Sequence, residues 1–275
     1  MPKLLPKDDP NLQKAVVRLA RGQLLWGWLF IGLGLFTEIA AGAAHPVSGL
    51  PFIAIGVACL RWSDPALIAA VATLLALSIW PSLNPSASIL GPEPLYRVFD
   101  LGLVERGALV FVKGILVYTA LQQFAVLRFL YGTETATSDD PDLPLIPAMI
   151  PNNTDRFARW ARTVAFGGII FAILALLLTL FDPAAPFART LAELGGSLGA
   201  VALGLGLGAA FSPTDEREAA LWAIGLGAVS YIASAVLALQ LPLMEFGVWS
   251  LGFGVWDLGF GICRSIIPLC LFVAS

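Results

Sequence analysis

The chain has 275 residues, of which 58% are hydrophobic and 13% are charged, and its formal net charge is −3. A soluble domain carries about 25% charged and about 45–50% apolar residues, so this composition excludes an ordinary soluble protein and predicts an integral membrane protein. The chain also lacks a basic run with interleaved aromatics, which excludes nucleic acid as an expected partner.

Apolar runs long enough to cross a bilayer recur along the chain, since a helical span needs about 20 residues, within a range of about 17–25. These runs predict an all-α polytopic protein with about eight transmembrane helices, at 22–42, 48–62, 66–83, 106–131, 162–181, 190–211, 217–240 and 258–274. The second and last runs are short for a span. Without the second, the count falls to seven and the C-terminus changes side.

The first run follows a basic lead and ends in small residues near Ala41–Ala44, as a signal peptide does. Its polar lead is long for a signal peptide, however. We therefore expect this run to be a retained transmembrane span.

Basic residues predict the orientation, because Lys and Arg favour the cytoplasmic side of a membrane. With eight spans and a cytoplasmic N-terminus, eleven of the sixteen basic residues fall on the cytoplasmic side. These are Lys3, Lys7, Lys14, Arg18, Arg21, Arg61, Arg128, Arg156, Arg159, Arg162 and Arg217. Only Arg97, Arg106 and Arg189 fall in outer loops. We expect a plasma-membrane protein with both termini in the cytoplasm.

The longest polar stretch, residues 132–158, holds four prolines and an acidic cluster, which is typical of a linker. It divides the chain into similar halves. We expect a cytoplasmic segment 1–21, a four-helix unit 22–131, a cytoplasmic linker 132–158 and a second four-helix unit 159–275.

Three landmarks recur in the same order in both halves and predict a 4+4 internal repeat. The pairs are Arg18-Leu-Ala-Arg21 with Arg159-Trp-Ala-Arg162, Ser63-Asp64-Pro65 with Ser212-Pro213-Thr214-Asp215, and Val98-Phe-Asp-Leu-Gly102 with Val255-Trp-Asp-Leu-Gly259. An Asp-Pro pair before an apolar run is a helix-start signal, with Asp as the cap. Generic capping explains part of the similarity, but not the Asp-Leu-Gly match. Four spans in each half make the repeat parallel rather than inverted.

Glycines within the spans predict close helix packing. Gly195-x-x-x-Gly199 and Gly204-x-x-x-Gly208 place small residues one turn apart, where another backbone can approach. Ala219, Ala223 and Gly227 repeat the pattern. The run Gly204-Leu-Gly206-Leu-Gly208 is not a nucleotide-binding loop, because that fingerprint follows a strand.

Ionisable side chains near the membrane are the candidates for a polar site, because an ion at mid-bilayer costs about 2.5–3.5 kcal/mol by insertion scales. The main candidates are Asp100, Arg106, Asp257 and Arg264, and the weaker ones are Glu38 and Lys113. Arg264 stands out because Pro268 would free its backbone carbonyl. Lys113 has a chain long enough to snorkel towards the interface.

The four main residues have two interpretations. The first is a lock between the repeats, which pairs Asp100 with Arg264 and Asp257 with Arg106. The second is a polar ligand site in the outer half of the membrane. We prefer the lock, because buried ion pairs can specify how helices pack.

Catalytic signatures are sparse in this sequence. It has one histidine, His45, and no H-E-x-x-H, C-x-x-C or G-x-S-x-G motif. No catalytic residue, metal site or cofactor is predicted, and one imidazole cannot supply a bis-histidine haem. The sequence leaves room for a bound lipid, quinone or pigment.

These features favour a non-catalytic integral membrane subunit or scaffold of a larger complex, in contact with lipid and with other membrane subunits. The outer loops 84–105 and 241–257 are rich in Gly, Pro and aromatics, which suits contact with another membrane protein or with a lipid or quinone tail. The alternative is a transporter or channel for a small or lipid-like solute, with a polar site near Arg264, Asp257 and Asp100. The third hypothesis is a membrane enzyme acting on a lipid or isoprenoid.

Overall fold

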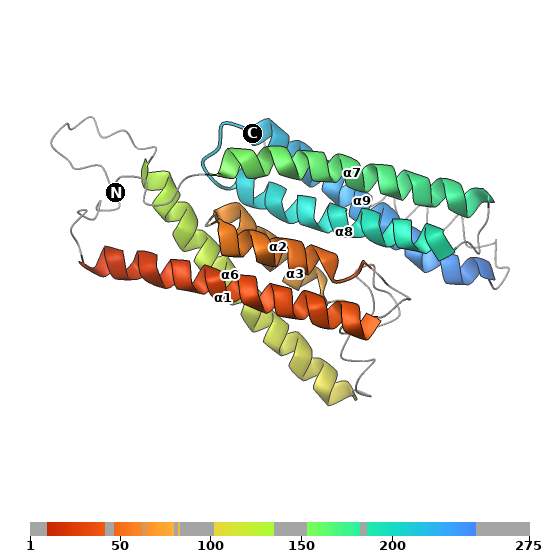
Figure 1. Ribbon diagram of the computed structural model, residues 1–275, viewed down its shortest axis with the longest axis horizontal. Helices are drawn as coiled ribbons and strands as arrows, with labels where there is room; N and C mark the ends of the chain where they lie inside the picture. The colour runs from red at the N-terminus through yellow and green to blue at the C-terminus, as the bar shows by residue number, and fades with distance from the viewer. Residues whose placement is uncertain are drawn as a thin grey trace.

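The structure is a computed structural model that describes residues 10–41, 47–62, 64–79, 82, 102–134, 153–181 and 186–245. The described residues form helices and no strand, which confirms the all-helical prediction for this part of the chain (Figure 1). The helices are α1 (Pro10–Ala41), α2 (Leu50–Arg61), α3 (Pro65–Leu77), α6 (Leu103–Glu134), α7 (Thr154–Phe181), α8 (Pro186–Ala210) and α9 (Arg217–Glu245).

Five of these helices are long and apolar enough to cross a membrane, namely α1, α6, α7, α8 and α9. They coincide with five predicted spans. The predicted spans 48–62 and 66–83 correspond to α2 and α3, which have only 12 and 13 residues. Each is about 20 Å long, less than the ~30 Å of a hydrocarbon core. The predicted span 258–274 lies outside the described residues.

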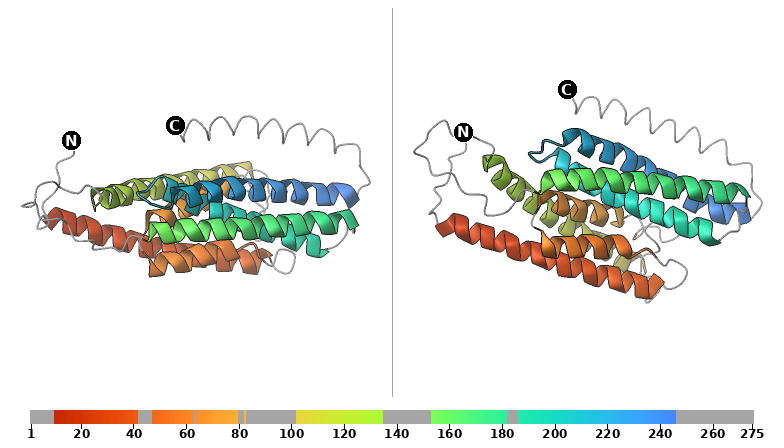
Figure 2. Two further views of the ribbon diagram at one scale, coloured as in Figure 1. Left: turned by 90° about the horizontal axis from the view of Figure 1, so that it is seen from above. Right: turned by 45° about the horizontal axis from the view of Figure 1, so that its top comes forward.

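The helix α3 lies at the centre of the molecule. It packs against α8 and α6 and contacts α2 and α7, and α6 and α2 lie on opposite sides in the left view of Figure 2. Ten of its thirteen residues are buried. A helix that is apolar all round belongs in an interior, which explains why α3 is apolar without being a full span.

The helices α7, α8 and α9 pack on one another and form a three-helix bundle beside α3. Glycines of α8 allow its backbone to approach those of α9 and α3 closely. A Cβ on Gly199 of α8 would lie 2.7 Å from the Gly227 carbonyl oxygen of α9, and a Cβ on Gly204 would lie 2.6 Å from the Ala70 Cα of α3. Real Cβ atoms essentially never come this close, so the predicted packing role of these glycines is confirmed.

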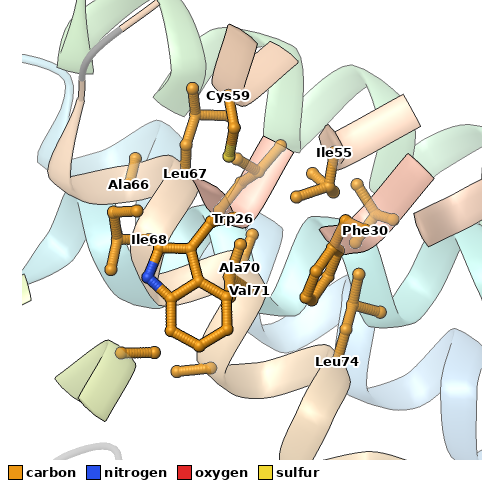
Figure 3. Close-up of a cluster of buried hydrophobic side chains, with 14 of the residues drawn as sticks. Trp26, Phe30, Ile55, Cys59, Ala66, Leu67, Ile68, Ala70, Val71 and Leu74 are labelled. Atoms are coloured by element: carbon orange, nitrogen blue, oxygen red, sulfur yellow. The ribbon is translucent and has the colours of Figure 1, made fainter. Parts of the chain in front are cut away.

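A second contact joins α1 to α2 and to α3. Aromatic side chains of α1 lie against aliphatic side chains of the two shorter helices (Figure 3). Trp26 and Phe30 meet edge to face with ring centroids 6.4 Å apart, and Phe30 lies 5.6 Å from the Phe52 ring of α2. The Trp26 indole N–H, which would otherwise be unsatisfied in this apolar cluster, donates to Gln123 Oε1 of α6 at 2.7 Å.

The helix α6 crosses the other helices obliquely (Figure 1). One face, which includes Ala120 and Leu127, is buried in the core. The opposite face is exposed along the whole apolar span. On that face Phe111 is 70% exposed and Tyr118 is 62% exposed.

Candidate functional site at one end of the bundle

A buried carboxylate joins two helices at one end of the molecule. Asp64 is fully buried at the start of α3, where its Oδ1 accepts a hydrogen bond from the Ala66 N–H at 2.8 Å. This is the helix cap that the Asp-Pro pair predicts. The Asp64 Oδ2 also accepts the Asn153 N–H and the Thr154 hydroxyl, each at 3.2 Å. One side chain therefore caps α3 and ties it to the first turn of α7. We call Asp64, Ala66, Asn153 and Thr154 the Asp64 junction.

The next residue of α7 extends this connection to the turn between α8 and α9. Asp155 Oδ1 accepts a hydrogen bond from the Thr214 hydroxyl and another from the Asp215 N–H at 3.1 Å. Thr214 Oγ1 in turn accepts the Glu216 N–H at 3.1 Å, next to the start of α9. The starts of α3, α7 and α9 thus meet at one end of the bundle.

Burial raises the pKa of the Asp64 carboxyl from 3.8 to about 6, because the charged form loses hydration. The hydrogen bonds from Ala66, Thr154 and Asn153 lower the pKa, and the negative charge of Asp155 raises it slightly further. The junction can therefore take up a proton under mildly acidic conditions.

The raised pKa predicts how stability depends on pH. The folded protein binds the Asp64 proton more tightly than the unfolded chain, so the contribution of this group is greatest below about pH 3.8 and is lost as the pH rises through about 6. The full effect is about 2–3 kcal/mol. We expect Asp64→Asn, which keeps a capping oxygen, to remove this part of the pH dependence. The thermal midpoints of the wild type and of Asp64→Asn, measured in detergent between pH 4 and 7, test this prediction. Midpoints that change with pH in the same way in both proteins would contradict it.

Three aromatic side chains that flank the junction in the chain form a cluster. Trp62, Phe157 and Trp160 contact one another edge to face, with ring centroids 5.7–5.9 Å apart. Phe157 is buried, whereas Trp160 is 40% exposed. Gln23 of α1 donates to the Trp62 carbonyl oxygen at 2.7 Å, which holds α1 against the turn between α2 and α3.

Two arginines lie over these indole rings. The guanidinium carbon of Arg156 lies 4.5 Å from the ring centroid of Trp160 and 5.5 Å from that of Trp62. That of Arg61 lies 5.2 Å from the Trp62 centroid. We call Arg61, Trp62, Arg156 and Trp160 the guanidinium–indole cluster.

The residues predicted from the sequence lie elsewhere. Asp100, Asp257 and Arg264 are outside the described residues, so the lock and the ligand site both stay predictions. Arg106 is half-buried in the first turn of α6, where its backbone N–H donates to the Gly102 carbonyl oxygen at 3.1 Å.

The two weaker candidates bind backbone near helix ends. Glu38 Oε1 of α1 accepts the Gly49 N–H at 2.6 Å, just before α2 begins. Lys113 of α6 is buried, and its Nζ donates to the Ser78 carbonyl oxygen and to Ser82 Oγ, both at 2.8 Å. A cation near the last carbonyls of a helix is favourable, so Lys113 stabilises the C-terminal end of α3.

Sequence reasoning missed a buried acid in α8. Glu193 is 2% exposed, and its Oε1 lies 3.5 Å from Nε of Arg189. The signal in the sequence was the spacing of four residues, which brings two side chains together on a helix. Among the described residues, no group of three or more His, Cys, Asp or Glu side chains could hold a metal ion.

Comparisons with protein-family models, with curated proteins and with solved structures found no match for this chain.

Proposed function

We propose that this protein is a non-catalytic integral membrane subunit, or scaffold, of a larger membrane complex, and that the outward face of α6 contacts a transmembrane helix of another subunit. The observation that carries this proposal is a pair of open glycines. Gly107 and Gly114 lie seven residues apart on this face, and a Cβ at either position would meet no atom of another described element within 4 Å. The glycines that α8 places in its span at residues 195, 199, 204, 206 and 208 all meet a neighbouring helix instead.

Polar groups on the same face support a protein partner. Gln122 Nε2 donates to the Tyr118 hydroxyl oxygen at 2.7 Å, and this pair is exposed. Lipid tails cannot offer hydrogen bonds to the remaining amide and hydroxyl groups, whereas a neighbouring helix can. Glycines that permit close approach and polar groups that need partners therefore occur together on α6.

The tight interior of the bundle supports a structural role over a transport role. Ser230 of α9 donates to the Gly195 carbonyl oxygen at 2.8 Å. A Cβ on Gly195 would lie 2.9 Å from Ser234 Oγ and 3.0 Å from the Ala172 nitrogen. Ser230 thus joins α9 to α8 by a hydrogen bond, at a place where α7, α8 and α9 approach one another too closely to leave a passage.

The same proposal includes a parallel 4+4 repeat with both termini in the cytoplasm of a plasma-membrane protein. The hydrogen bonds of Thr154 with Asp64 and of Thr214 with Asp155 support it, because they bring the starts of α3 and α9, which the proposed repeat makes equivalent, to the same end. Arg61, Arg156, Arg159 and Arg217 lie at or next to these helix ends, as the positive-inside rule expects of a cytoplasmic side.

Site-specific photo-crosslinking in native membranes tests the α6 contact. A photoreactive residue at Tyr118 is expected to give one adduct of defined mass with an integral membrane protein. The same residue at Ile170, an exposed position on α7, is the matched control and is expected to give no protein adduct. Equal labelling from both positions, or an adduct from 118 that persists in a Gly114→Leu background, would contradict the proposal.

A further inference from the structure

The guanidinium–indole cluster places two arginines over indole rings, which carry no charge of their own. Among the described residues, neither Arg61 nor Arg156 forms an ion pair, whereas Arg159 lies 3.9 Å from Glu216. Both side chains belong to exposed residues. A guanidinium that lies over an aromatic face keeps the N–H groups at its edge available for a second partner. The cluster therefore presents two positive charges and several oriented donors to an outside ligand.

The position of the cluster matches that of lipid headgroups. Arg61 ends α2, and Arg156 lies in the first turn of α7, a helix long and apolar enough to span. Trp62 and Trp160 are partly exposed beside them. Tryptophans at the ends of spans lie at the level of the headgroups.

An apolar strip continues from the cluster along α7. With about 3.6 residues per turn, Thr163, Gly167, Ile170 and Leu174 follow Trp160 on the same side of the helix. The hydroxyl of Thr163 donates to the Arg159 carbonyl oxygen at 3.1 Å. Ile170 is 56% exposed and Leu174 is 43% exposed. An acyl chain could lie along this strip while its headgroup contacts the arginines. A free phosphate ion would leave the strip unused.

We propose that the guanidinium–indole cluster is a binding site for an anionic phospholipid, with Arg61 and Arg156 donating to the phosphodiester and the acyl chain lying along α7. Arginine is well suited to this role because its planar fork donates two parallel hydrogen bonds to phosphate oxygens. The indoles of Trp62 and Trp160 restrict the rotamers of the arginines, so less conformational entropy is lost when the lipid binds.

Native mass spectrometry of the full-length protein in a non-ionic detergent tests this site. The probes are phosphatidylglycerol and phosphatidylcholine with identical acyl chains. We expect preferential binding of phosphatidylglycerol, and a loss of about five-fold in its affinity for each of Arg61→Gln and Arg156→Gln. Arg156→Lys keeps the charge without the fork, so its affinity is expected to fall between those of wild type and Arg156→Gln.

The matched control is Arg162→Gln, which removes an exposed arginine from another side of the same end of α7 and is expected to leave the affinity unchanged. Thermal midpoints of all variants separate a lost contact from a misfolded protein. Equal affinities for the two lipids, or wild-type affinity in the Arg61→Gln/Arg156→Gln double variant, would overturn the proposal. Displacement of the lipid by excess inorganic phosphate would instead identify a soluble anion as the ligand and overturn the lipid assignment.

Discussion

Gly208→Ala is expected to destabilise the protein by about 3 kcal/mol, because the added methyl group has no room between α8 and α3. A Cβ on Gly208 would lie 2.5 Å from the Ala66 Cα and 2.7 Å from the Ala69 Cβ. Both atoms belong to the central helix α3, which is held on its other sides by α6 and α2. The new methyl group must therefore push two helices apart.

Gly225→Ala is the matched control for this prediction. Gly225 is also a mid-helix glycine, but a Cβ there would meet no neighbouring helix within 4 Å in the described part of the chain. Both substitutions gain the same helix propensity, up to about 1 kcal/mol, so the difference between them isolates the packing. Unfolding in mild detergent, followed by circular dichroism, measures both. Equal stabilities would show that α8 does not contact α3 as closely as described.

Gly114→Leu is expected to release the chain from its complex without lowering the stability of the chain itself. The leucine side chain would fill the space in which we place the partner helix, and no atom of the described residues lies within 4 Å of that Cβ position. The fraction of the chain that migrates in the large assembly measures the effect. Gly225→Leu adds the same side chain at an open position of α9 and is expected to leave the assembly intact. Loss of the assembly in both variants would show that the effect is not specific to α6.

Local signals in the sequence predicted much of the fold. Asp64-Pro65 predicted the start of α3, and the spacing of Gly204 and Gly208 predicted a closely packed face. The cap signal depends on interactions within a few residues, and the glycine signal depends on side-chain size alone. They do not reveal which helix is the neighbour, since Gly204 and Gly208 face α3 whereas Gly206, between them, faces α9.

The helix lengths were less predictable. Hydropathy alone does not distinguish a buried helix from a span, so the run at 66–83 resembled a transmembrane helix. The helix α3 ends at Leu77, where the Ser78 hydroxyl bonds to the Leu75 carbonyl oxygen and Lys113 binds the Ser78 carbonyl. Lys113 comes from another helix, so this end depends on tertiary structure.

The candidate site depends on contacts between distant residues. Asp64 and Thr154 are 90 positions apart in the chain. The sequence predicted Asp64 only as a helix cap and Thr154 only as part of the linker 132–158. Likewise, the sequence predicted Arg156 only as a cytoplasmic charge. Its position over the Trp62 ring depends on how α7 packs near α2 and α3, and the sequence does not indicate that packing. The sequence therefore predicted a cytoplasmic side for these arginines, which stays a prediction, and it did not indicate which of them share an aromatic partner.

The mass of the particle that mild detergent releases from native membranes tests the central claim most directly. A subunit that docks through α6 is expected to purify in fixed stoichiometry with at least one other integral membrane protein, in a particle well above the 29.1 kDa of this chain. A monodisperse particle that contains only this chain, as a monomer or a homodimer, would contradict the proposed function.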